Sequence, residues 1–83
     1  MKVQVRYFAS LREGLGAAET VDMPPDSSVG QLRDLLLTRS ERHAELLARG
    51  RAVRCALAQR LCEEDQALAE GAEVAFFPPV TGG

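Results

Sequence analysis

The sequence predicts an α+β roll, a mixed sheet with one main helix packed on it, and three observations predict this fold class. Strand-like alternation opens the chain at residues 2–7 and returns at residues 73–77. An amphipathic stretch at residues 28–36 separates the first two strands from the later ones. The expected order is therefore strand, strand, helix, strand, short strand, strand. A helical crossover in that order covers one face of a mixed sheet.

The first predicted strand covers residues 2–7. Its inward-facing residues, by the period of two, are Val3, Val5 and Tyr7. Phe8 falls on the opposite side of the alternation, so we expect it to face outward.

The next segment, residues 10–16, contains two glycines and is expected to form a turn or one loose helical turn. Residues 19–23 form a second short strand, with Val21 and Met23 facing inward. The two strands are predicted to pair as an antiparallel hairpin.

The main helix follows two prolines, which end the second strand. Ser28 is the expected N-cap, and Gln31 completes a capping box. The apolar face is predicted to consist of Val29, Leu32, Leu35 and Leu36. The solvent-facing residues are predicted to be Gln31, Arg33 and Asp34.

A weaker helix is predicted over residues 40–49, with an apolar side that consists of Ala44, Leu47 and Ala48. Gly50 is expected to end it. His43 is expected on the solvated face of this helix, because the sequence offers it no partner for metal binding or acid–base chemistry.

The last part of the chain is predicted to contain three strands. They cover residues 53–58, 61–62 and 73–77, with a turn at Glu70-Gly71 before the last one. In the final strand, parity places Val74 and Phe76 inside and Phe77 outside. Because Phe8 also faces outward on a neighbouring strand, the two rings are expected to form an exposed apolar patch of the kind that marks an interface.

Composition excludes several classes of function. The chain has 83 residues, one domain's length, and a formal net charge of −2 with no block of basic residues, so no nucleic-acid partner is expected. No apolar run approaches the ~20 residues that span a bilayer, and the first residues alternate at once, unlike a signal peptide. We therefore expect no membrane partner and a cytoplasmic location.

The chain holds few residues for catalysis. It has one His and two Cys, and the spacing of Cys55 and Cys62 matches no usual zinc pattern, so no metal site is expected. Cys55 is expected to be a small buried residue, while a persulfide role for either cysteine is a remaining alternative. These residues alone are too few to predict a self-sufficient enzyme.

The C-terminal segment offers a different kind of chemistry. We expect a domain at residues 1–77 and an extended tail at residues 78–83, because Pro78 and Pro79 favour extended backbone. The tail residues after the prolines are Val80, Thr81, Gly82 and Gly83. A Gly-Gly end is slim enough to thread a narrow channel and to present its carboxylate to another protein's active site. A partner could convert this carboxylate to an acyl adenylate. A sulfur nucleophile could then take the acyl group, and the product would be a thiocarboxylate.

Two stretches of the chain, VRYFASLRE at residues 5–13 and EVAFFPPVTGG at residues 73–83, resemble the MoaD family, the small subunits of molybdopterin synthase. The resemblance covers the whole chain and implies a ubiquitin-like β-grasp fold. Ala58 departs from the family pattern, since many members have Asn there. The turn before the last strand departs as well, because it is Glu70-Gly71-Ala72 here and often Asp-Gly-Asp in the family. Both departures concern turns.

The resemblance implies that Gly83 is the carrier residue. A MoeB-like, E1-like enzyme would adenylate it with ATP and magnesium, and a sulfur donor protein would then give the thiocarboxylate. The tail, residues 78–82, would insert into a MoaE-like large subunit that holds the catalytic residues. There the sulfur would pass to cyclic pyranopterin monophosphate. Such complexes are heterotetramers, and the small subunit contacts the large one through residues matching Phe8, Leu61 and Phe77.

Three alternatives remain open at this point. The chain is also compatible with a related carrier for another pathway, such as thiamine synthesis. A ubiquitin-like modifier that is joined to lysines is a second alternative. A passive binding module with a purely structural tail is the third.

Overall fold

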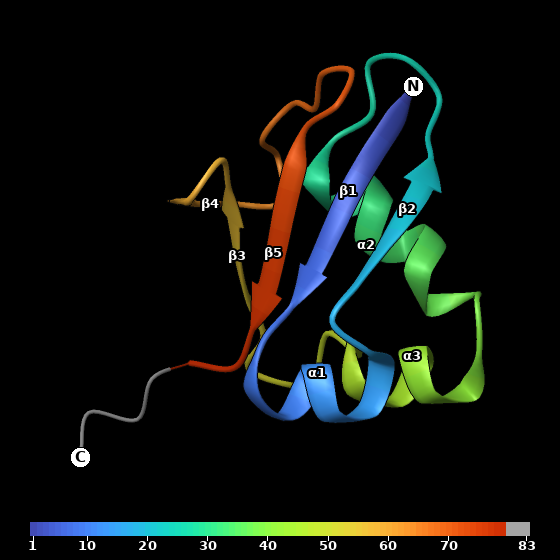
Figure 1. Ribbon diagram of the computed structural model, residues 1–83, viewed down its shortest axis with the longest axis vertical. Coiled ribbons are helices and arrows are strands. Elements are labelled where there is room, and N and C mark those ends of the chain that lie inside the picture. Colours follow the sequence, from blue (N-terminus) through green and yellow to red (C-terminus); the bar gives the residue numbers. More distant parts are fainter. Residues whose placement is uncertain (80–83) are drawn as a thin grey trace.

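Five strands form one mixed sheet in the computed structural model, which describes residues 1–79. The strands are β1 (Lys2–Tyr7), β2 (Ala18–Asp22), β3 (Arg54–Leu57), β4 (Arg60–Cys62) and β5 (Glu73–Phe77). Their order across the sheet is β2-β1-β5-β3-β4. The central strands β1 and β5 run parallel, and the other neighbours run antiparallel (Figure 1). The predicted α+β roll is confirmed.

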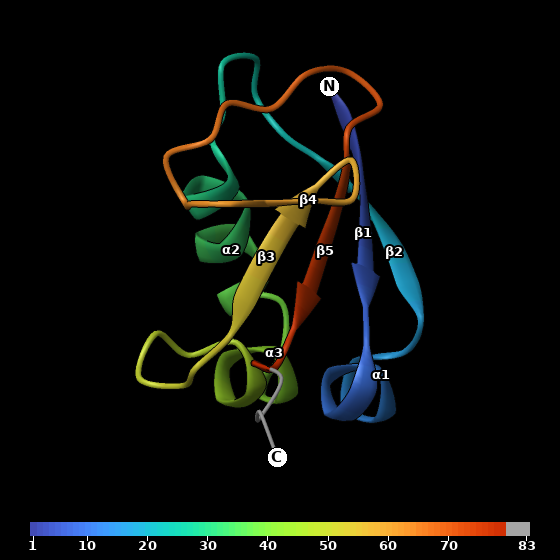
Figure 2. The ribbon, with the colours of Figure 1, turned by 90° about the vertical axis from the view of Figure 1, so that its left-hand side faces the viewer.

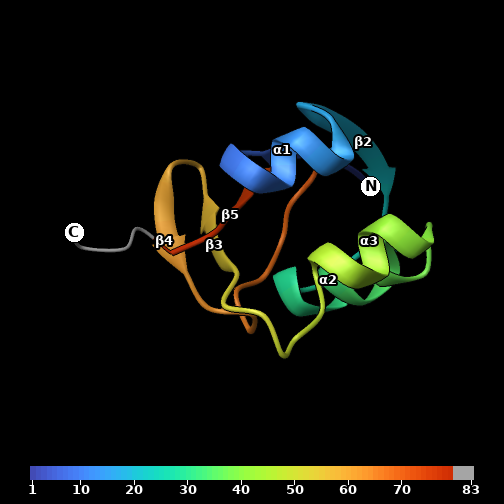
Figure 3. The same ribbon diagram turned by 90° about the horizontal axis from the view of Figure 1, so that it is seen from below.

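Three helices accompany the sheet in the described residues: α1 (Ala9–Leu15), α2 (Val29–Leu37) and α3 (Glu41–Leu46). Figure 2 shows α2 and α3 on one face of the sheet, and Figure 3 shows these two helices side by side. α1 lies at the end of the sheet where β1 finishes (Figure 1). The core fills the space between the helices and the inner face. Its fully buried side chains are Val3, Val5, Tyr7, Val21, Val29, Leu32, Leu36, Leu47, Val74 and Phe76.

The N-terminal hairpin follows the predicted pattern. Val3 pairs with Val21 in the antiparallel β1–β2 ladder, and both side chains are fully buried. The segment after β1, in contrast, is a seven-residue helix rather than a turn or one loose turn. Gly14 lets this helix approach α3, since a Cβ at Gly14 would collide with the Leu46 side chain.

Helix α2 begins as predicted. The Ser28 hydroxyl accepts from the Gln31 N–H, and the Gln31 side chain accepts from the Ser28 N–H, which completes the capping box. Two predictions about its faces are wrong. Arg33 is buried rather than solvent-facing, and Leu35 is 36% exposed rather than part of the apolar face.

The physical reason is the helical period. Val29, Leu32 and Leu36 are fully buried, and position 33 completes the same stripe at the fourth residue after Val29. The Arg33 guanidinium is buried because three groups accept hydrogen bonds from it. They are the carbonyl oxygens of Leu47 and Ala48 and the Glu64 carboxylate, at 2.7–3.1 Å.

Helix α3 is shorter than the predicted 40–49. It ends at Leu46 with Leu47 as its C-cap, so Gly50 does not terminate it. Leu47 is buried as expected, but Ala44 is exposed. The helix is only six residues long, so its apolar side is confined to the end that packs on the core.

Strands β3 and β4 form a tight hairpin. Leu57 pairs with Arg60, which leaves Ala58 and Gln59 as a two-residue turn with φ values of 49° and 68°. Ala58 therefore lies in a left-handed turn. The prediction that it ends the strand over residues 53–58 is wrong. The turn before β5, at Glu70-Gly71, is confirmed, and Gly71 has a φ of 78°.

Among residues 1–79, no helix is long and apolar enough to cross a membrane.

Candidate functional site

The outer face of the sheet carries a row of small and apolar residues across three strands. Ala75 of β5 pairs with Ala56 of β3, and Ala56 pairs with Leu61 of β4. Paired residues in neighbouring strands point to the same face of a sheet. Leu61 is 64% exposed, and Figure 2 shows α2 and α3 together on one face of the sheet.

Phe8 and Phe77 lie on the same outer face as Ala75, Ala56 and Leu61. They are nearer than those residues to the end of the sheet where β1 and β5 finish. Tyr7 pairs with Phe76 in the parallel β1–β5 ladder, and both are buried on the inner face. The residues that follow them therefore face outward. The Phe8 N–H donates to the Phe76 carbonyl oxygen at 3.2 Å, which extends the ladder and holds the two phenylalanines on adjacent strands.

The exposure of these two rings differs. Phe8 is 42% exposed, as predicted, whereas Phe77 is half-buried. We call the set Phe8, Phe77, Ala75, Ala56 and Leu61 the outer patch. The structure thus places on one face of the sheet the two phenylalanines that parity predicted for a partner surface and Leu61, which the family resemblance implied. Phe8 directly follows β1, Leu61 lies on β4 and Phe77 ends β5.

Arginines border the outer patch. The Arg6 guanidinium lies 5.9 Å from the centre of the Phe8 ring and 3.9 Å from the Glu73 carboxylate. Arg54 pairs with Phe77 across β3 and β5 and is exposed. An apolar centre with a charged border is the usual organisation of a protein interface.

The tail begins next to the outer patch. Pro78 and Pro79 follow β5 directly, and Pro78 lines a hollow of about 220 Å³ together with residues of α1 and of the segment after α3. The predicted tail residues Val80, Thr81, Gly82 and Gly83 lie outside the described residues. Their role as the inserted tail, and that of Gly83 as the carrier, stay predictions.

A polar cluster around Glu19 and His43 lies away from the outer patch, and the sequence did not predict it. His43 was predicted on a solvated face, but its side chain is only 14% exposed. Its Nε2 lies 2.8 Å from the Glu19 carboxylate, and its Nδ1 lies 2.7 Å from the Ser40 hydroxyl. The Tyr7 hydroxyl and Arg39 also donate to Glu19, at 2.7 and 2.9 Å. No local signal could have found this cluster, because Glu19 is 24 residues from His43.

Glu19 is charged in this cluster. Burial favours its neutral form, but hydrogen bonds from His43 and Tyr7 and the charges of His43 and Arg39 outweigh burial and lower its pKa. Burial and the contact with Glu19 raise the pKa of Tyr7. These contacts join β1, β2 and α3. Because they join three elements of the fold, we assign the cluster to stability.

Residues 1–79 hold no group of three or more His, Cys, Asp or Glu side chains that is arranged to bind a metal ion. Cys55 is buried, as the sequence predicted, and Cys62 is half-buried beside it.

Solved structures support the fold. The chain has a TM-score of 0.63 with a ubiquitin described as from Caldiarchaeum subterraneum, at 17% identity, which identifies the fold as a ubiquitin-like β-grasp. It has a TM-score of 0.80 with SAMP1 from Haloferax volcanii, at 28% identity over the whole of both chains. The TM-score is 0.72 with a protein in the complex of subunits 1 and 2 of the molybdopterin-converting factor from Helicobacter pylori, at 26% identity over both whole chains.

Sequence comparison gives the same grouping. The molybdopterin synthase sulfur carrier subunit of Escherichia coli is 40% identical to this chain over 81 residues, which is 98% of this chain and 99% of that protein. Residues 5–83 match the ThiS family. The outer patch and the start of the tail lie within that match. From the fold, the full-length relatives and the extent of the family match, we conclude that the chain belongs to the ThiS family.

Proposed function

We propose that this protein is the sulfur carrier subunit of a molybdopterin synthase and that the carboxylate of Gly83 carries the sulfur. The observation that carries the proposal is the 40% identity, over almost the full length of both chains, to a protein named as that subunit. The tail sequence PPVTGG supports it, because the last two residues have no side chains to obstruct a narrow channel.

The chemistry needs no catalytic side chain from this protein. The Gly83 carboxylate attacks the α-phosphorus of ATP, pyrophosphate leaves, and an acyl adenylate forms. A hydrosulfide ion released by the donor then attacks the carbonyl carbon, AMP leaves, and loss of the sulfur-bound proton gives a thiocarboxylate. We assign both steps to partners: a MoeB-like activating enzyme that uses ATP and magnesium, and a sulfur donor protein.

The sulfur then passes to cyclic pyranopterin monophosphate in the active site of a MoaE-like large subunit. Each carrier brings one sulfur, so two carriers are consumed for one dithiolene. The outer patch is the proposed docking surface for the large subunit, with Phe8, Leu61 and Phe77 as the apolar contacts. Its place supports this role, because β5 leads from the patch directly into the tail. A related Helicobacter pylori protein occurs in a complex of subunits 1 and 2 of the molybdopterin-converting factor.

A second candidate is a ubiquitin-like modifier. SAMP1, one of the similar structures, is also described as a small archaeal modifier protein. Both functions begin with an acyl adenylate, but a modifier passes its acyl group to a lysine amine and keeps no sulfur. The two differ in their products, so one assay separates them.

The test is a transfer assay with a chain that already carries the thiocarboxylate. It is mixed with the large subunit and cyclic pyranopterin monophosphate, and both the pterin product and the carrier are followed by mass spectrometry. We expect a dithiolene product and a carrier that returns to its carboxylate form. A carrier that keeps its sulfur in this mixture, or that forms lysine conjugates on a denaturing gel after activation in cell extract, contradicts the carrier function.

A further inference from the structure

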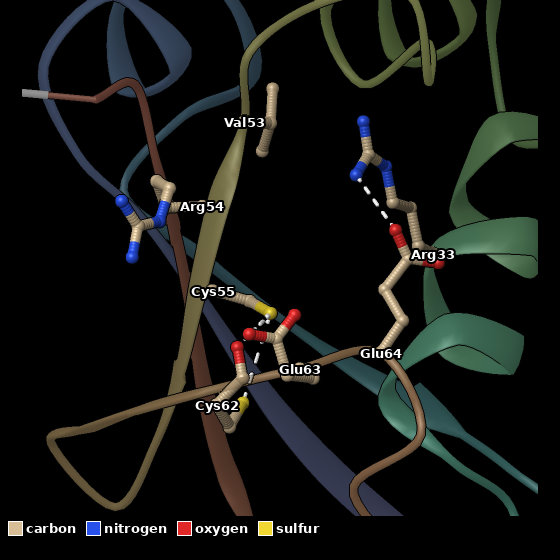
Figure 4. A pocket seen from close by; sticks show the side chains of 7 residues that line it. All are labelled: Arg33, Val53, Arg54, Cys55, Cys62, Glu63 and Glu64. Atoms are coloured by element: carbon tan, nitrogen blue, oxygen red, sulfur yellow. Dashed lines mark hydrogen bonds and ion pairs between the residues drawn. The ribbon is translucent and has the colours of Figure 1, made fainter.

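Two cysteines face each other across the β3–β4 hairpin. Cys55 and Cys62 are register partners in the antiparallel ladder, and their sulfur atoms are 3.7 Å apart. The Cys62 thiol donates to the Cys55 sulfur, and the Cys55 thiol donates to the Cys62 carbonyl oxygen at 3.3 Å. Figure 4 shows the two sulfur atoms pointing toward each other.

The pair borders an open hollow. Its volume is about 260 Å³, and its walls include Arg33, Glu63 and Glu64 as well as both cysteines. Figure 4 shows the cysteines on one side of the hollow and the Arg33–Glu64 ion pair on the other. Cys55 is 7% exposed, while Cys62 is half-buried, so a small reagent meets Cys62 first.

The register of the two cysteines is compatible with a disulfide. Directly opposed residues in an antiparallel ladder have Cα atoms about 4.5–5.5 Å apart. Disulfides accept Cα separations of about 4.4–6.8 Å. The sulfur atoms, now 3.7 Å apart, have to approach to about 2 Å to bond, and the paired register supports that approach.

We propose that Cys55 and Cys62 form a dithiol–disulfide site that a small disulfide of the glutathione class oxidises. The Cys62 thiolate attacks one sulfur of the reagent, a mixed disulfide forms, and one thiol leaves. The Cys55 thiol then loses its proton, attacks the Cys62 sulfur and expels the second thiol. The two protein thiols are oxidised, the reagent's S–S bond is reduced, and two small thiols are released.

The surroundings fix the order of these steps. Burial, reinforced by the hydrogen bond with Cys62 and by the charges of Cys62, Glu64 and Glu63, raises the pKa of the Cys55 thiol to about 12. Cys55 is therefore a poor first nucleophile. Once Cys62 carries the mixed disulfide, the Cys55 thiol is held next to the Cys62 sulfur. This proximity speeds the second attack and offsets the low nucleophilicity of Cys55.

The disulfide would fasten the edge strand β4 to β3. It would close a short loop whose turn residues, Ala58 and Gln59, both have left-handed backbone. Leu61 precedes Cys62, so the fastened strand is also the strand that carries the most exposed residue of the outer patch. The dithiol site itself does not depend on the proposed sulfur-carrier function.

The full chain is first fully reduced and then equilibrated with oxidised and reduced glutathione in a series of ratios. Intact mass and maleimide labelling in denaturant are then measured. We expect the mass to fall by about 2 Da, the two hydrogens that are lost, with no maleimide uptake and no dimer. Dithiothreitol should restore both thiols. The oxidised chain should also melt at a higher temperature than the reduced chain.

Two serine variants provide the matched controls. Cys55→Ser should retain one glutathionyl group on Cys62, because no second thiol is present to displace it. Cys62→Ser should stay unmodified while folded, because Cys55 is buried. The proposal is overturned if the wild-type chain keeps two labelled thiols under the most oxidising ratio, accumulates a stable glutathione adduct, or forms disulfide-linked dimers instead.

Discussion

Glu19 is the residue on which most of the polar contacts between β1, β2 and α3 converge. It accepts hydrogen bonds from Tyr7, Arg39 and His43 at 2.7–2.9 Å. A carboxylate only accepts, so the His43 Nε2 carries the proton in this contact. Because these donors stabilise the charged form, Glu19 contributes to stability only while it is ionised.

The pH dependence of stability follows from the direction of this shift. The pKa of Glu19 is lowered in the folded state, so its contribution is present above its ordinary value of 4.5 and is lost as the pH falls through the folded pKa. We expect Glu19→Gln to lower the free energy of unfolding by about 1 kcal/mol near neutral pH. Between neutral pH and acid, the variant should lose less stability than the wild-type chain, as measured by urea denaturation.

Glu45→Gln is the matched control for this variant. Glu45 is exposed on α3 and has no ion pair within the described residues. Its replacement should leave the unfolding free energy and its pH dependence within about 0.5 kcal/mol of the wild type. Equal pH profiles for Glu19→Gln and the wild-type chain would contradict the role of Glu19.

Phe8 is the most exposed ring of the outer patch, and it is the residue that tests the docking surface best. Phe8→Asp replaces an apolar contact with a charge that must be desolvated on binding. We expect it to weaken binding of the large subunit by about 2 kcal/mol or more, which is about thirty-fold in Kd. Isothermal titration with the large subunit measures this change, and Phe77→Asp should act in the same direction.

Leu35→Asp is the control for a general loss of apolar surface. Leu35 is as exposed as many surface residues, but it lies on α2, on the other side of the sheet from the outer patch. It should leave the affinity unchanged. Equal affinities for the wild-type chain and Phe8→Asp, with both proteins folded by circular dichroism, would remove the outer patch as the docking surface.

At the scale of elements, the β3–β4 hairpin has a turn whose backbone does not suit its sequence. Ala58 and Gln59 both have positive φ, which type I′ turns require and which Asn and Gly adopt at little cost. Ala58→Asn and Gln59→Gly should each raise the free energy of unfolding by about 0.5–1 kcal/mol. Thermal or urea unfolding measures the gain.

Gln66→Gly is the matched control for the hairpin. Gln66 lies in a loop but does not have a positive φ, so glycine there only increases the freedom of the unfolded chain. That variant should be less stable than the wild type. A loss of stability in Gln59→Gly as well would contradict the assignment of the turn.

Helix α2 is fastened to the segment after α3 through Arg33. Its guanidinium donates to the carbonyl oxygens of Leu47 and Ala48 and to Glu64. Arg33→Met keeps most of the aliphatic stem but removes all three hydrogen bonds. The Ala48 carbonyl keeps the Arg51 N–H and Glu64 keeps Arg49 as donors, so the buried Leu47 carbonyl is the acceptor that loses its partner. We expect a loss of about 2–4 kcal/mol in the free energy of unfolding.

Arg12→Met is the corresponding control on an exposed helix surface. Arg12 lies on α1, is exposed, and has no ion pair among residues 1–79. Its replacement should change the unfolding free energy by less than about 0.5 kcal/mol. If both variants unfold at the same urea concentration, Arg33 does not hold the two segments together.

These elements also show what the sequence could and could not reveal. The strands and the capping box of α2 were predictable, because period-two alternation and an N-cap are local signals. Arg33 was predicted to face solvent because its side chain is charged, although its position completes the buried stripe of α2. His43 was misplaced because its partner Glu19 is distant in the chain, and only the folded sheet brings the two together. The outward direction of Phe8 and Phe77 was predictable from parity, since each follows a buried residue at a strand end, whereas Leu61 was implied only by the family resemblance.

At the scale of the whole molecule, the sheet topology positions one end of the chain for delivery. β1 and β5 are parallel neighbours, so both finish at the end of the sheet where α1 lies, while the N-terminus lies at the opposite end (Figure 1). The proposed tail therefore starts beside the outer patch and away from the N-terminus. The domain, in this account, holds and docks a reactive group that belongs to the main chain.

The most direct test of this central claim is the mass of the chain after activation. The protein is incubated with ATP, magnesium, a MoeB-like activating enzyme and a sulfur donor, and intact and fragment masses are measured. We expect a mass increase equal to the replacement of one oxygen by sulfur, located on Gly83. Removing Gly83, or adding one residue after it, should abolish the increase, whereas a Cys55→Ser, Cys62→Ser double variant should retain it. If the increase survives the removal of Gly83, or maps to either cysteine, Gly83 is not the residue that carries the sulfur.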